Sequence, residues 1–262
     1  MTLLEADRLS ITFGGVRAID GVSLAVAAGQ VFSIIGPNGS GKTTLINLVS
    51  GLYTPQDGAI RLAGETVTGL APDRLARRGL SRTFQNLQIF SRMSVLQNVM
   101  VGRHRHERTG IFADLLHWPS VARQNAATRE AAVVALDRVG LADAAGRQAG
   151  SLAYGALKRL EIARALASEP RLLLLDEPAA GCNPVETQEL DQVIRSLVKD
   201  GITVVLVEHD MRLVMNISDR VHVLARGRTL AEGTPHEVRA NAEVIEAYLG
   251  VHGSREAAHA LD

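Results

Sequence analysis

A glycine-rich segment between an apolar run and a helix-forming run constrains the fold of this chain most. The segment fits the pattern G-x-x-x-x-G-K-[ST] at every fixed position. It reads Gly36, Pro37, Asn38, Gly39, Ser40, Gly41, Lys42 and Thr43. Residues 31–35 before it have the length of a buried strand, and residues 43–49 after it are expected to be helical. A strand, a glycine-rich turn and a helix in this order are typical of a phosphate-binding unit.

The residue types in this loop suit a triphosphate tail bound together with Mg²⁺. Glycines let backbone N–H groups turn towards the phosphates, and the following helix offers unpaired N–H groups and the positive end of its dipole. Lys42 would place a charge on the outer phosphates, and Thr43 would place a hydroxyl on Mg²⁺. Thr44, the next residue, joins the nucleotide-binding candidates. The fixed letters can match by chance, but the flanking strand and helix favour ATP and Mg²⁺ as cofactors.

Two carboxylates follow a second apolar run. Residues 172–175 are all leucine and predict a buried strand, which is followed by Asp176 and Glu177. In a parallel sheet, ligands lie beyond the carboxyl ends of the strands. Asp176 would then face Mg²⁺, and Glu177 would act as general base on the attacking water, or at least orient it. An acidic pair alone is an ordinary strand exit, but beside a complete phosphate loop it predicts a catalytic site.

His209 and Gln85 follow two other predicted strands. His209 comes just after residues 202–207, so it should lie at the same sheet edge as Glu177, where it could contact the γ-phosphate; a structural role fits its position equally well. Gln85 follows residues 80–84 and could reach Mg²⁺ and the water, although a polar loop residue is the commoner meaning of such a glutamine. His222, within a strand pattern, is expected to be a packed histidine.

The chain divides into four stretches with different patterns, which are residues 1–86, 87–168, 169–250 and 251–262. The first holds the phosphate loop and two expected strands separated by Gly14 and Gly15. The second has Ala, Arg and Leu at helical spacing and predicts an inserted helical subdomain. Strands and helices alternate again in the third, and the last is interpreted as a frayed tail. The expected fold class is α/β, a P-loop NTPase (RecA-like) core with a mixed sheet, an N-terminal antiparallel β part and the helical subdomain.

Local signals refine this division. Asn183 is expected to cap a helix that has Pro184 at its first position and Gly201 just past its end. Residues 102–120 are expected to be the least ordered part of the helical subdomain. The charged run at residues 103–108 within them is interpreted as a solvated loop, with a partner-binding surface as the less favoured alternative.

Composition limits the class of protein. Lys and Arg number 28, as do Asp and Glu, so no broad electrostatic field would attract nucleic acid. The single cysteine, Cys182, cannot form an internal disulfide, which suits a reducing compartment. The apolar runs have strand length, far below the ~20 residues of a spanning helix, and no signal-peptide pattern opens the chain. We therefore expect a soluble chain, which another protein must hold if it works at a membrane.

Taken together, the motifs resemble those of the ATP-binding-cassette (ABC) ATPases, and within them the subunit that powers branched-chain amino acid uptake in bacteria. The general motifs are the phosphate loop, Gln85, a signature-like segment at residues 152–166, the strand end Asp176-Glu177-Pro178, and His209. The finer resemblance rests on longer strings, which are Phe13-Gly14-Gly15-Val16, Arg82-Thr83-Phe84-Gln85-Asn86, residues 159–166, Glu177-Pro178-Ala179-Ala180-Gly181, Val207-Glu208-His209-Asp210-Met211 and residues 244–249. The resemblance covers nearly the whole chain, from about residue 4 to residue 250.

The resemblance implies roles for several further residues. Such chains are expected to work as head-to-tail dimers, with ATP held between the phosphate loop of one chain and the signature segment of the other. Phe13 would stack on the adenine, and Ala153, Tyr154 and Gly155 of the signature would contact the nucleotide of the partner chain. Residues 180–183 would form the loop that links the two sites.

Two departures from the family pattern affect these expectations. The signature usually begins Leu-Ser-Gly-Gly-Gln, and the subfamily often has Tyr at the third place, which fits Tyr154. Ala153 lacks the hydroxyl that would bond the γ-phosphate of the opposite ATP, a loss of ~1.5–3 kcal/mol, and Ala156 lacks a polar side chain. Gly155 and the helix start keep their N–H donors. Cys182 stands where an aliphatic residue is more usual, and is interpreted as a small buried hydrophobe.

The resemblance also implies partners at a membrane. They are integral-membrane permease subunits, gripped by the helical subdomain and the region around Gln85, a second ATPase subunit that is a sister chain or another copy, and indirectly a periplasmic substrate-binding protein. No nucleic acid is expected, and the implied location is the cytoplasmic face of the inner (plasma) membrane, as a peripheral subunit. The expected cargo is branched-chain or other neutral amino acids. Alternatives are a cassette for another cargo, such as urea or exported lipopolysaccharide, a soluble cassette ATPase outside transport, and a nucleotide-binding regulatory module without turnover.

Overall fold

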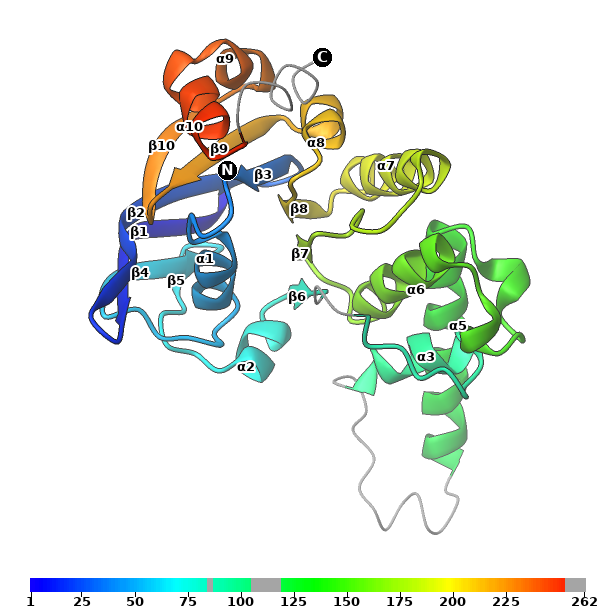
Figure 1. Cartoon of the computed structure of the whole chain (residues 1–262). Coiled ribbons are helices and arrows are strands. Elements are labelled where there is room, and N and C mark those ends of the chain that lie inside the picture. The colour runs from blue at the N-terminus through cyan, green and yellow to red at the C-terminus, as the bar shows by residue number, and fades with distance from the viewer. Residues whose placement is uncertain (84–86, 105–118, 253–262) are drawn as a thin grey trace.

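The strands form two sheets, and the longer helices gather beside them (Figure 1). The computed structural model describes residues 1–83, 87–104 and 119–252. Its strands are β1 (Thr2–Phe13), β2 (Val16–Ala27), β3 (Val31–Ile35), β4 (Asp57–Leu62), β5 (Glu65–Thr66), β6 (Leu80–Arg82), β7 (Leu172–Asp176), β8 (Thr203–Val207), β9 (Arg220–Ala225) and β10 (Arg228–Gly233). Its α-helices are α1 (Lys42–Val49), α2 (Pro72–Arg77), α3 (Val95–Val101), α5 (Pro119–Arg138), α6 (Tyr154–Leu166), α7 (Pro184–Lys199), α8 (Met211–Ile217), α9 (Pro235–Ala240) and α10 (Ala242–His252).

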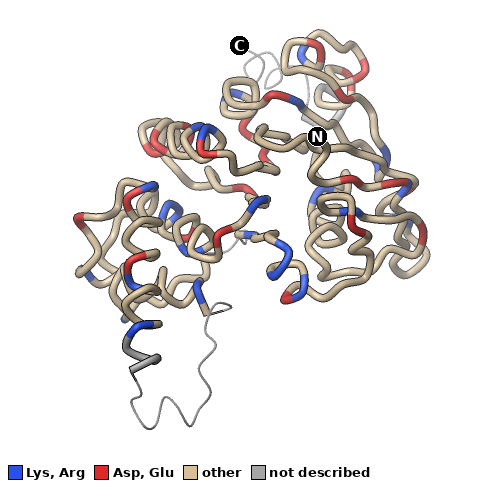
Figure 2. The backbone as a smooth tube through the Cα atoms, turned by 180° about the vertical axis from the view of Figure 1, so that it is seen from behind, with Lys and Arg blue, Asp and Glu red and all other residues tan. Residues whose placement is uncertain are grey.

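Charged residues of both signs are distributed over the described elements. Figure 2 shows Lys and Arg interspersed with Asp and Glu along the chain, and the last turn of α2 carries Arg74 and Arg77. No helix within the residues that the structure describes combines the length and the apolar character that a membrane span needs.

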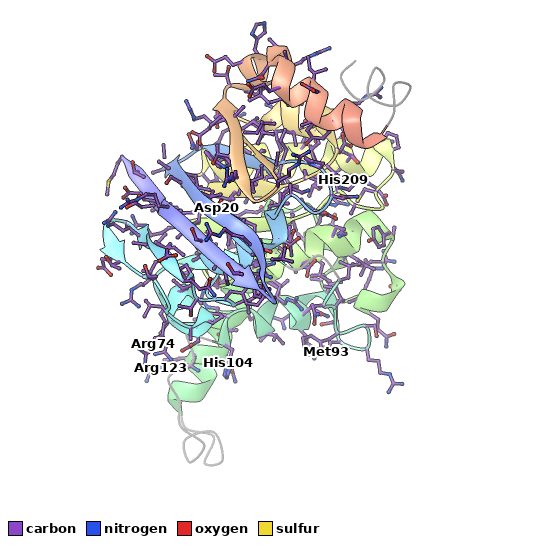
Figure 3. All side chains as sticks on the ribbon, turned by 60° about the vertical axis from the view of Figure 1, so that its left-hand side comes forward. Asp20, Arg74, Met93, His104, Arg123 and His209 are labelled. Atoms are coloured by element: carbon purple, nitrogen blue, oxygen red, sulfur yellow. The ribbon has the colours of Figure 1, made fainter. Side chains whose placement is uncertain are left out.

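The N-terminal part forms an antiparallel sheet in the order β2-β1-β4-β5. β1 and β2 pair along their length around a turn at Gly14 and Gly15, as these glycines predict. Many alternate residues of β2 are buried, the pattern of a sheet with one face on a core. Asp20 of β2 accepts hydrogen bonds from Arg17 (2.8 Å) and from Arg228 of β10 (2.7 Å), and these bonds lower the pKa of its carboxyl. Asp20 therefore ties this sheet to the second one (Figure 3).

The second sheet is mixed and has the order β10-β9-β3-β8-β7-β6. β10 and β9 pair antiparallel, and the other neighbours pair parallel, with Val31 opposite Val204 and Asp176 opposite Val207. β3, β7 and β8 are buried along their whole length, which accounts for their continuous apolar sequences. The parallel strands bring the phosphate loop after β3, the acidic pair at the end of β7 and the segment after β8 to one edge of the sheet.

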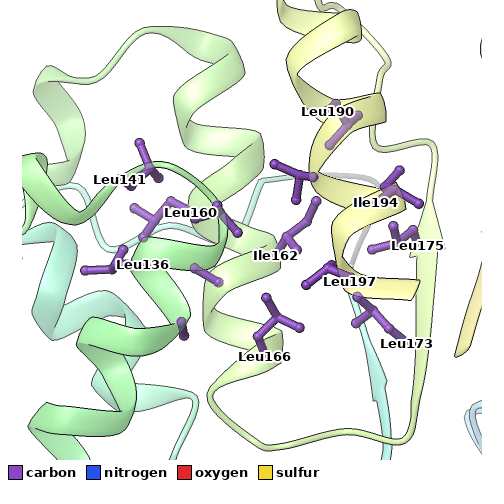
Figure 4. Close-up of a cluster of buried hydrophobic side chains, with 14 of the residues drawn as sticks. Leu136, Leu141, Leu160, Ile162, Leu166, Leu173, Leu175, Leu190, Ile194 and Leu197 are labelled. Atoms are coloured by element: carbon purple, nitrogen blue, oxygen red, sulfur yellow. The ribbon is translucent and has the colours of Figure 1, made fainter. Parts of the chain in front are cut away.

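Successive residues of the central strands pack on opposite faces of this sheet. Leu172 and Leu174 of β7 belong to the buried cluster that contains α1 and the antiparallel sheet. Leu173 and Leu175 belong to the cluster that contains α6 and α7, which Figure 4 shows in close-up. α1 and α6 therefore lie on opposite faces of the central sheet.

The stretch of residues 87–168 contains the helices that its spacing predicts. α3, α5 and α6 pack around fully buried side chains such as Leu136 and Leu160. Most of residues 102–120, the part expected to be least ordered, lies outside the described residues, and its last two residues form the start of α5.

Helix caps were easier to predict than short helices. The Asn183 side chain accepts hydrogen bonds from the N–H groups of the first turn of α7, Pro184 opens that helix, and Gly201 follows its end with a φ of +88°, all as expected. α2, α8 and α9 were not predicted, because helices of six or seven residues are too short to display a helical period. The strand expected over residues 80–84 ends at Arg82 within the described residues, and α10 runs to His252, past the predicted start of the tail.

Candidate functional site

The phosphate loop joins β3 to α1 and is pressed against neighbouring backbone at two glycines. A Cβ atom at Gly36 would lie 2.2 Å from the carbonyl oxygen of Leu224 on β9. A Cβ atom at Gly41 would lie 2.8 Å from the carbonyl oxygen of Ala18 on β2, and Gly41 has a φ of +106°, which favours glycine. The two outer glycines of the motif are therefore required by the packing of the loop as well as by its ligand.

Lys42 extends back over this loop. Its Nζ donates hydrogen bonds to the carbonyl oxygens of Gly36 (2.7 Å) and Pro37 (3.2 Å). Burial lowers the pKa of the Lys42 ammonium, and the charges of Glu177 and Asp176 oppose that shift. The structure thus brings Asp176 and Glu177, at the end of β7, within electrostatic range of Lys42 at the start of α1, as predicted for the site.

The loop has features that fit a phosphate group. The N-cap of α1 is Gly41, which provides no side-chain cap, and the first turn of α1 holds no acidic residue, so the positive end of the helix is open to an anion. The hydroxyl of Ser40 is buried and has no hydrogen-bond partner among the described residues. Asn38 and Gly39 are exposed, as is Thr43, whereas Thr44 is half-buried. An anion with several oxygens would pair the donors that this part of the chain leaves open.

Asp176 and Glu177 stand at the carboxyl end of β7, as the sequence predicts. The N–H of Glu177 donates to the carbonyl of Val207 (2.8 Å), which extends the β7–β8 ladder by one bond. Glu177 has a φ of +49°, in the left-handed region that a glutamate rarely adopts. Such strain, worth about 1–3 kcal/mol, clusters at functional sites. It turns the chain sharply just where the predicted base stands.

Arg82 holds Asp176 and was missed by sequence reasoning. Its Nη2 lies 2.9 Å from Asp176 Oδ2, and both side chains are almost fully buried. Its Nη1 donates to Asn47 Oδ1 (2.7 Å) on α1 and to Oγ of Ser50 (2.8 Å), the C-cap of that helix. Arg82 therefore connects the strand end that carries Asp176 with the helix that follows the phosphate loop. The string 82–86 contained this arginine, but nothing local indicated its partner.

His209 follows β8 at the predicted edge, and Figure 3 labels it there. Its side chain is 61% exposed. Its N–H donates to Oε2 of the buried Glu208 (3.0 Å), a second residue that sequence reasoning missed. Contact of His209 with a γ-phosphate stays a prediction. Gln85 lies outside the described residues, so its predicted roles towards Mg²⁺ and the water also stay predictions.

Two aromatic side chains stand together on the surface near the first turn of the chain. Phe13, predicted to stack on adenine, is 44% exposed and meets Tyr53 edge-to-face, with ring centroids 5.2 Å apart. Exposed, paired rings of this kind can bind a flat aromatic ligand. Tyr53, in the segment after α1, was not predicted.

The signature segment begins α6. Ala153 is the N-cap of α6 and makes no side-chain hydrogen bond, as its methyl group requires. The N–H of Gly155 already donates to Glu186 Oε1 (2.9 Å), and Oε2 of the same carboxylate accepts from the N–H of Asn183 (2.9 Å). These two N–H groups lower the pKa of Glu186. One carboxylate thus caps both α6 and α7, and the Gly155 donor expected for a nucleotide has an acceptor within the chain.

Further contacts join the signature segment to the loop at residues 180–183. The Tyr154 ring lies so close to Gly181 that a Cβ atom there would be 3.0 Å from the ring. Lys158 Nζ lies 5.7 Å from the centroid of that ring and donates to the carbonyl of Glu177 (3.4 Å). The start of α6 is therefore in contact with the backbone of the predicted base.

Cys182, expected to be a small buried hydrophobe, is half-buried. Burial is the main cause that raises the pKa of its thiol. His222 is fully buried between Glu232 (2.9 Å) and Thr229 (3.2 Å), which confirms a packed histidine. Burial raises the pKa of Tyr248, whose hydroxyl approaches the backbone of Gly36, so α10 reaches the phosphate loop.

Comparisons with known proteins place the chain in a family. The family described as ABC transporter matches residues 19–180, and the family described as branched-chain amino acid ATP-binding cassette transporter matches residues 228–254. The chain is 48% identical to the high-affinity branched-chain amino acid transport ATP-binding protein BraF of Pseudomonas aeruginosa, over 95% of this chain and 98% of the relative. It is 46% identical to the protein LivG of Escherichia coli, which has a corresponding description, with the same coverage of both chains.

Solved structures give the same result. A nucleotide-free ATP-binding cassette from an ABC transporter superposes with a TM-score of 0.83 at 32% identity, covering 95% of this chain and 99% of the other. An ATP-binding cassette in its ADP conformation gives the same values. The chain therefore belongs to the ATP-binding subunits of ABC transporters, ATPases coupled to transport, and within them to the family of the branched-chain amino acid transport ATP-binding proteins.

Proposed function

We propose that this chain binds ATP at residues 36–43 and hydrolyses it to drive the uptake of branched-chain or other neutral amino acids. The cargo is inferred from relatives described as branched-chain amino acid transport proteins, which match almost end to end. The observation that carries the hydrolytic role is the convergence of Lys42, Asp176 and Glu177 at one sheet edge.

Each residue of the site has its own role in hydrolysis. The phosphate loop and Lys42 hold the β- and γ-phosphates, and the strained turn at Glu177 presents a carboxylate that accepts a proton from the attacking water. His209 orients the water and the γ-phosphate from the neighbouring loop. Thr43, Asp176 and Gln85 are the residues that would hold Mg²⁺, which, when bound, neutralises charge on the phosphates.

A second ATPase subunit completes the site. α1 and α6 pack on opposite faces of the central sheet, which supports a head-to-tail dimer in which Ala153, Tyr154 and Gly155 of one chain meet the nucleotide of the other. The second subunit is a sister chain or another copy. ATP at both sites would close the dimer, and hydrolysis would reopen it, so that differential binding of the nucleotide drives the conformational change.

The permease partners would bind at a cleft beside the helical part. A cavity of about 430 Å³ lies between α2, β6, α3 and α6, with Arg82, Phe90, Val101 and Arg164 among its lining residues. Its exposed apolar side chains, Phe90 and Val101, suit a short helix from a membrane subunit. The chain would then act as a peripheral subunit at the cytoplasmic face of the inner membrane, with a periplasmic binding protein as an indirect partner and no nucleic acid.

Reconstitution tests this proposal. The chain, co-purified with its permease subunits and any sister ATPase, is placed in lipid vesicles, and Mg²⁺-dependent ATP hydrolysis is measured with leucine, urea or no cargo supplied with the cognate binding protein. Stimulation by leucine supports the proposal. Stimulation by urea alone would replace the cargo, and failure of ATP to bind, or equal binding by a Lys42→Ala variant, would overturn the hydrolytic role.

A further inference from the structure

Glu208 is a fully buried carboxylate that contacts two separate loops. Its Oε1 accepts a hydrogen bond from the N–H of Ala179 (2.8 Å), two residues after Glu177. Its Oε2 accepts from the N–H groups of His209 (3.0 Å) and Asp210 (3.4 Å). One side chain thus bonds both to the loop that follows Glu177, the predicted base, and to the loop that contains His209, the predicted contact of the γ-phosphate.

The position of Glu208 explains why a carboxylate is needed there. The last backbone bond of the ladder between β7 and β8 runs from the N–H of Glu177 to the carbonyl of Val207, and loops follow on both chains. Buried N–H groups without an acceptor are costly, and a carboxylate supplies two acceptor oxygens in one plane. Burial raises the pKa of Glu208, while these N–H groups oppose the rise. An amide at this position would keep one acceptor oxygen and turn a donor towards the other loop.

We propose that Glu208 is a positioning residue that couples the loop of Glu177 to the loop of His209. Beyond the Glu177–Val207 backbone bond, this carboxylate then holds the loop after the base and the loop of the histidine at a fixed distance from each other. This proposal rests on the proposed function, because it gives these residues a joint task in hydrolysis. Misplacement of such groups by ~1 Å can cost about 100-fold in rate.

Two variants test separately whether Glu208 must reach both loops and whether it must carry a negative charge. Glu208→Gln keeps the size of the side chain but can accept from one loop only, and Glu208→Asp keeps the charge but is one methylene too short to reach both loops. Glu237→Gln is the matched control, since that carboxylate also accepts a backbone N–H bond, from Thr234 (2.7 Å), but on α9. Both Glu208 variants should lose turnover by about 10- to 100-fold, the usual cost of removing a supporting contact, with ATP affinity unchanged. Glu237→Gln should change neither.

The full-length chain is used for ATP binding and amide hydrogen exchange, and the assembled transporter for turnover. Exchange should show lost protection at Ala179 or at His209 in the Glu208 variants, with the phosphate loop unaffected. Wild-type turnover in Glu208→Asp or Glu208→Gln would overturn the proposal. So would a parallel loss of ATP affinity and turnover that follows the unfolded fraction, because that outcome reports a purely structural role.

The unaltered chain provides a test that does not depend on folding of a variant. If one carboxylate holds both loops, the amides of Ala179 and His209 should open together, with equal exchange rates across a range of denaturant concentrations. Independent exchange of the two amides would contradict the coupling. The Lys42→Ala variant keeps the two hypotheses apart: normal ATP binding by that variant defeats the proposed function, whereas defective binding together with normal turnover by Glu208→Gln defeats only the role of Glu208.

Discussion

Replacement of Arg82 by Met should destabilise the chain and make its stability depend more on Mg²⁺. Methionine has a similar unbranched length and fills the space without a charge. The Arg82–Asp176 pair is 2.9 Å apart, with side chains only 9% and 5% exposed, so removal of the arginine leaves Asp176 buried and unpaired by its main partner. Breaking a buried pair in this way costs about 3 kcal/mol or somewhat more. For a chain of this size we expect Tm to fall by about 6–12 °C.

A divalent cation at Asp176 should offset part of this loss. Mg²⁺ held with ATP would restore a positive charge to the same carboxylate, and any ligand that binds only the folded state adds to stability. The difference in Tm between wild type and Arg82→Met should therefore narrow by half or more when Mg²⁺ and ATP are added. It should remain at full size with ATP and a chelator. Thermal unfolding followed by calorimetry measures both conditions.

Ser50→Ala is the control for this experiment. It removes a neutral acceptor of Arg82 at the C-cap of α1 and leaves the charge pair in place, so it should cost only about 1 kcal/mol. Its Tm difference from wild type should be the same with and without Mg²⁺. If Mg²⁺ and ATP bind the Arg82→Met variant but leave its Tm difference unchanged, Asp176 does not face the metal. A loss of stability no larger than that of Ser50→Ala would refute the argument from the buried pair.

Three further predictions concern the site and the helical part. Glu177→Gln should retain ATP binding, hydrolyse ATP very slowly and accumulate dimers on size-exclusion chromatography; full turnover would remove Glu177 from the mechanism. Burial lowers the pKa of Lys42 from 10.5, so its positive charge is lost at a lower pH than that of a free lysine. In a pH titration, ATP affinity should therefore fall as the pH rises through this lowered pKa. ATP affinity that persists up to the pH range of an ordinary lysine would contradict this prediction. Leu160 of α6 is fully buried among α3, α5 and α6, so Leu160→Ala should lower the free energy of unfolding by about 2–5 kcal/mol in chemical denaturation. ATP affinity should not change. A decrease below about 1 kcal/mol would show that the helical part is loosely packed.

The parts of the site that could be predicted are those with a local signal. The apolar run before Gly36 and the leucines before Asp176 became buried strands with the predicted bounds or within a residue of them, because a strand that is buried on both faces has to be apolar throughout. Asn183 and Pro184 predict the start of α7, because a helix start needs an acceptor for its open N–H groups.

The contacts that could not be predicted depend on strand order. Arg82 meets Asp176 only because β6 lies beside β7, and Glu208 meets Ala179 only because β8 lies on the other side of β7. The residues in each of these pairs are far apart in the chain, and no spacing rule connects them. The double cap of Glu186 on Gly155 and Asn183 has the same origin, because it requires α6 and α7 to pack side by side.

Burial decides which carboxylate at the sheet edge can do chemistry. Glu177 and Glu208 each follow the last residue of a buried strand, β7 and β8 respectively. Glu208 is fully buried, and both of its oxygens accept backbone N–H bonds, so a water molecule or a nucleotide cannot reach it without opening two loops. Glu177 is half-buried at a left-handed turn, within electrostatic range of Lys42. A proton acceptor must meet its substrate at hydrogen-bond distance, which supports the proposed division of roles, with Glu177 as the base and Glu208 as the residue that positions it.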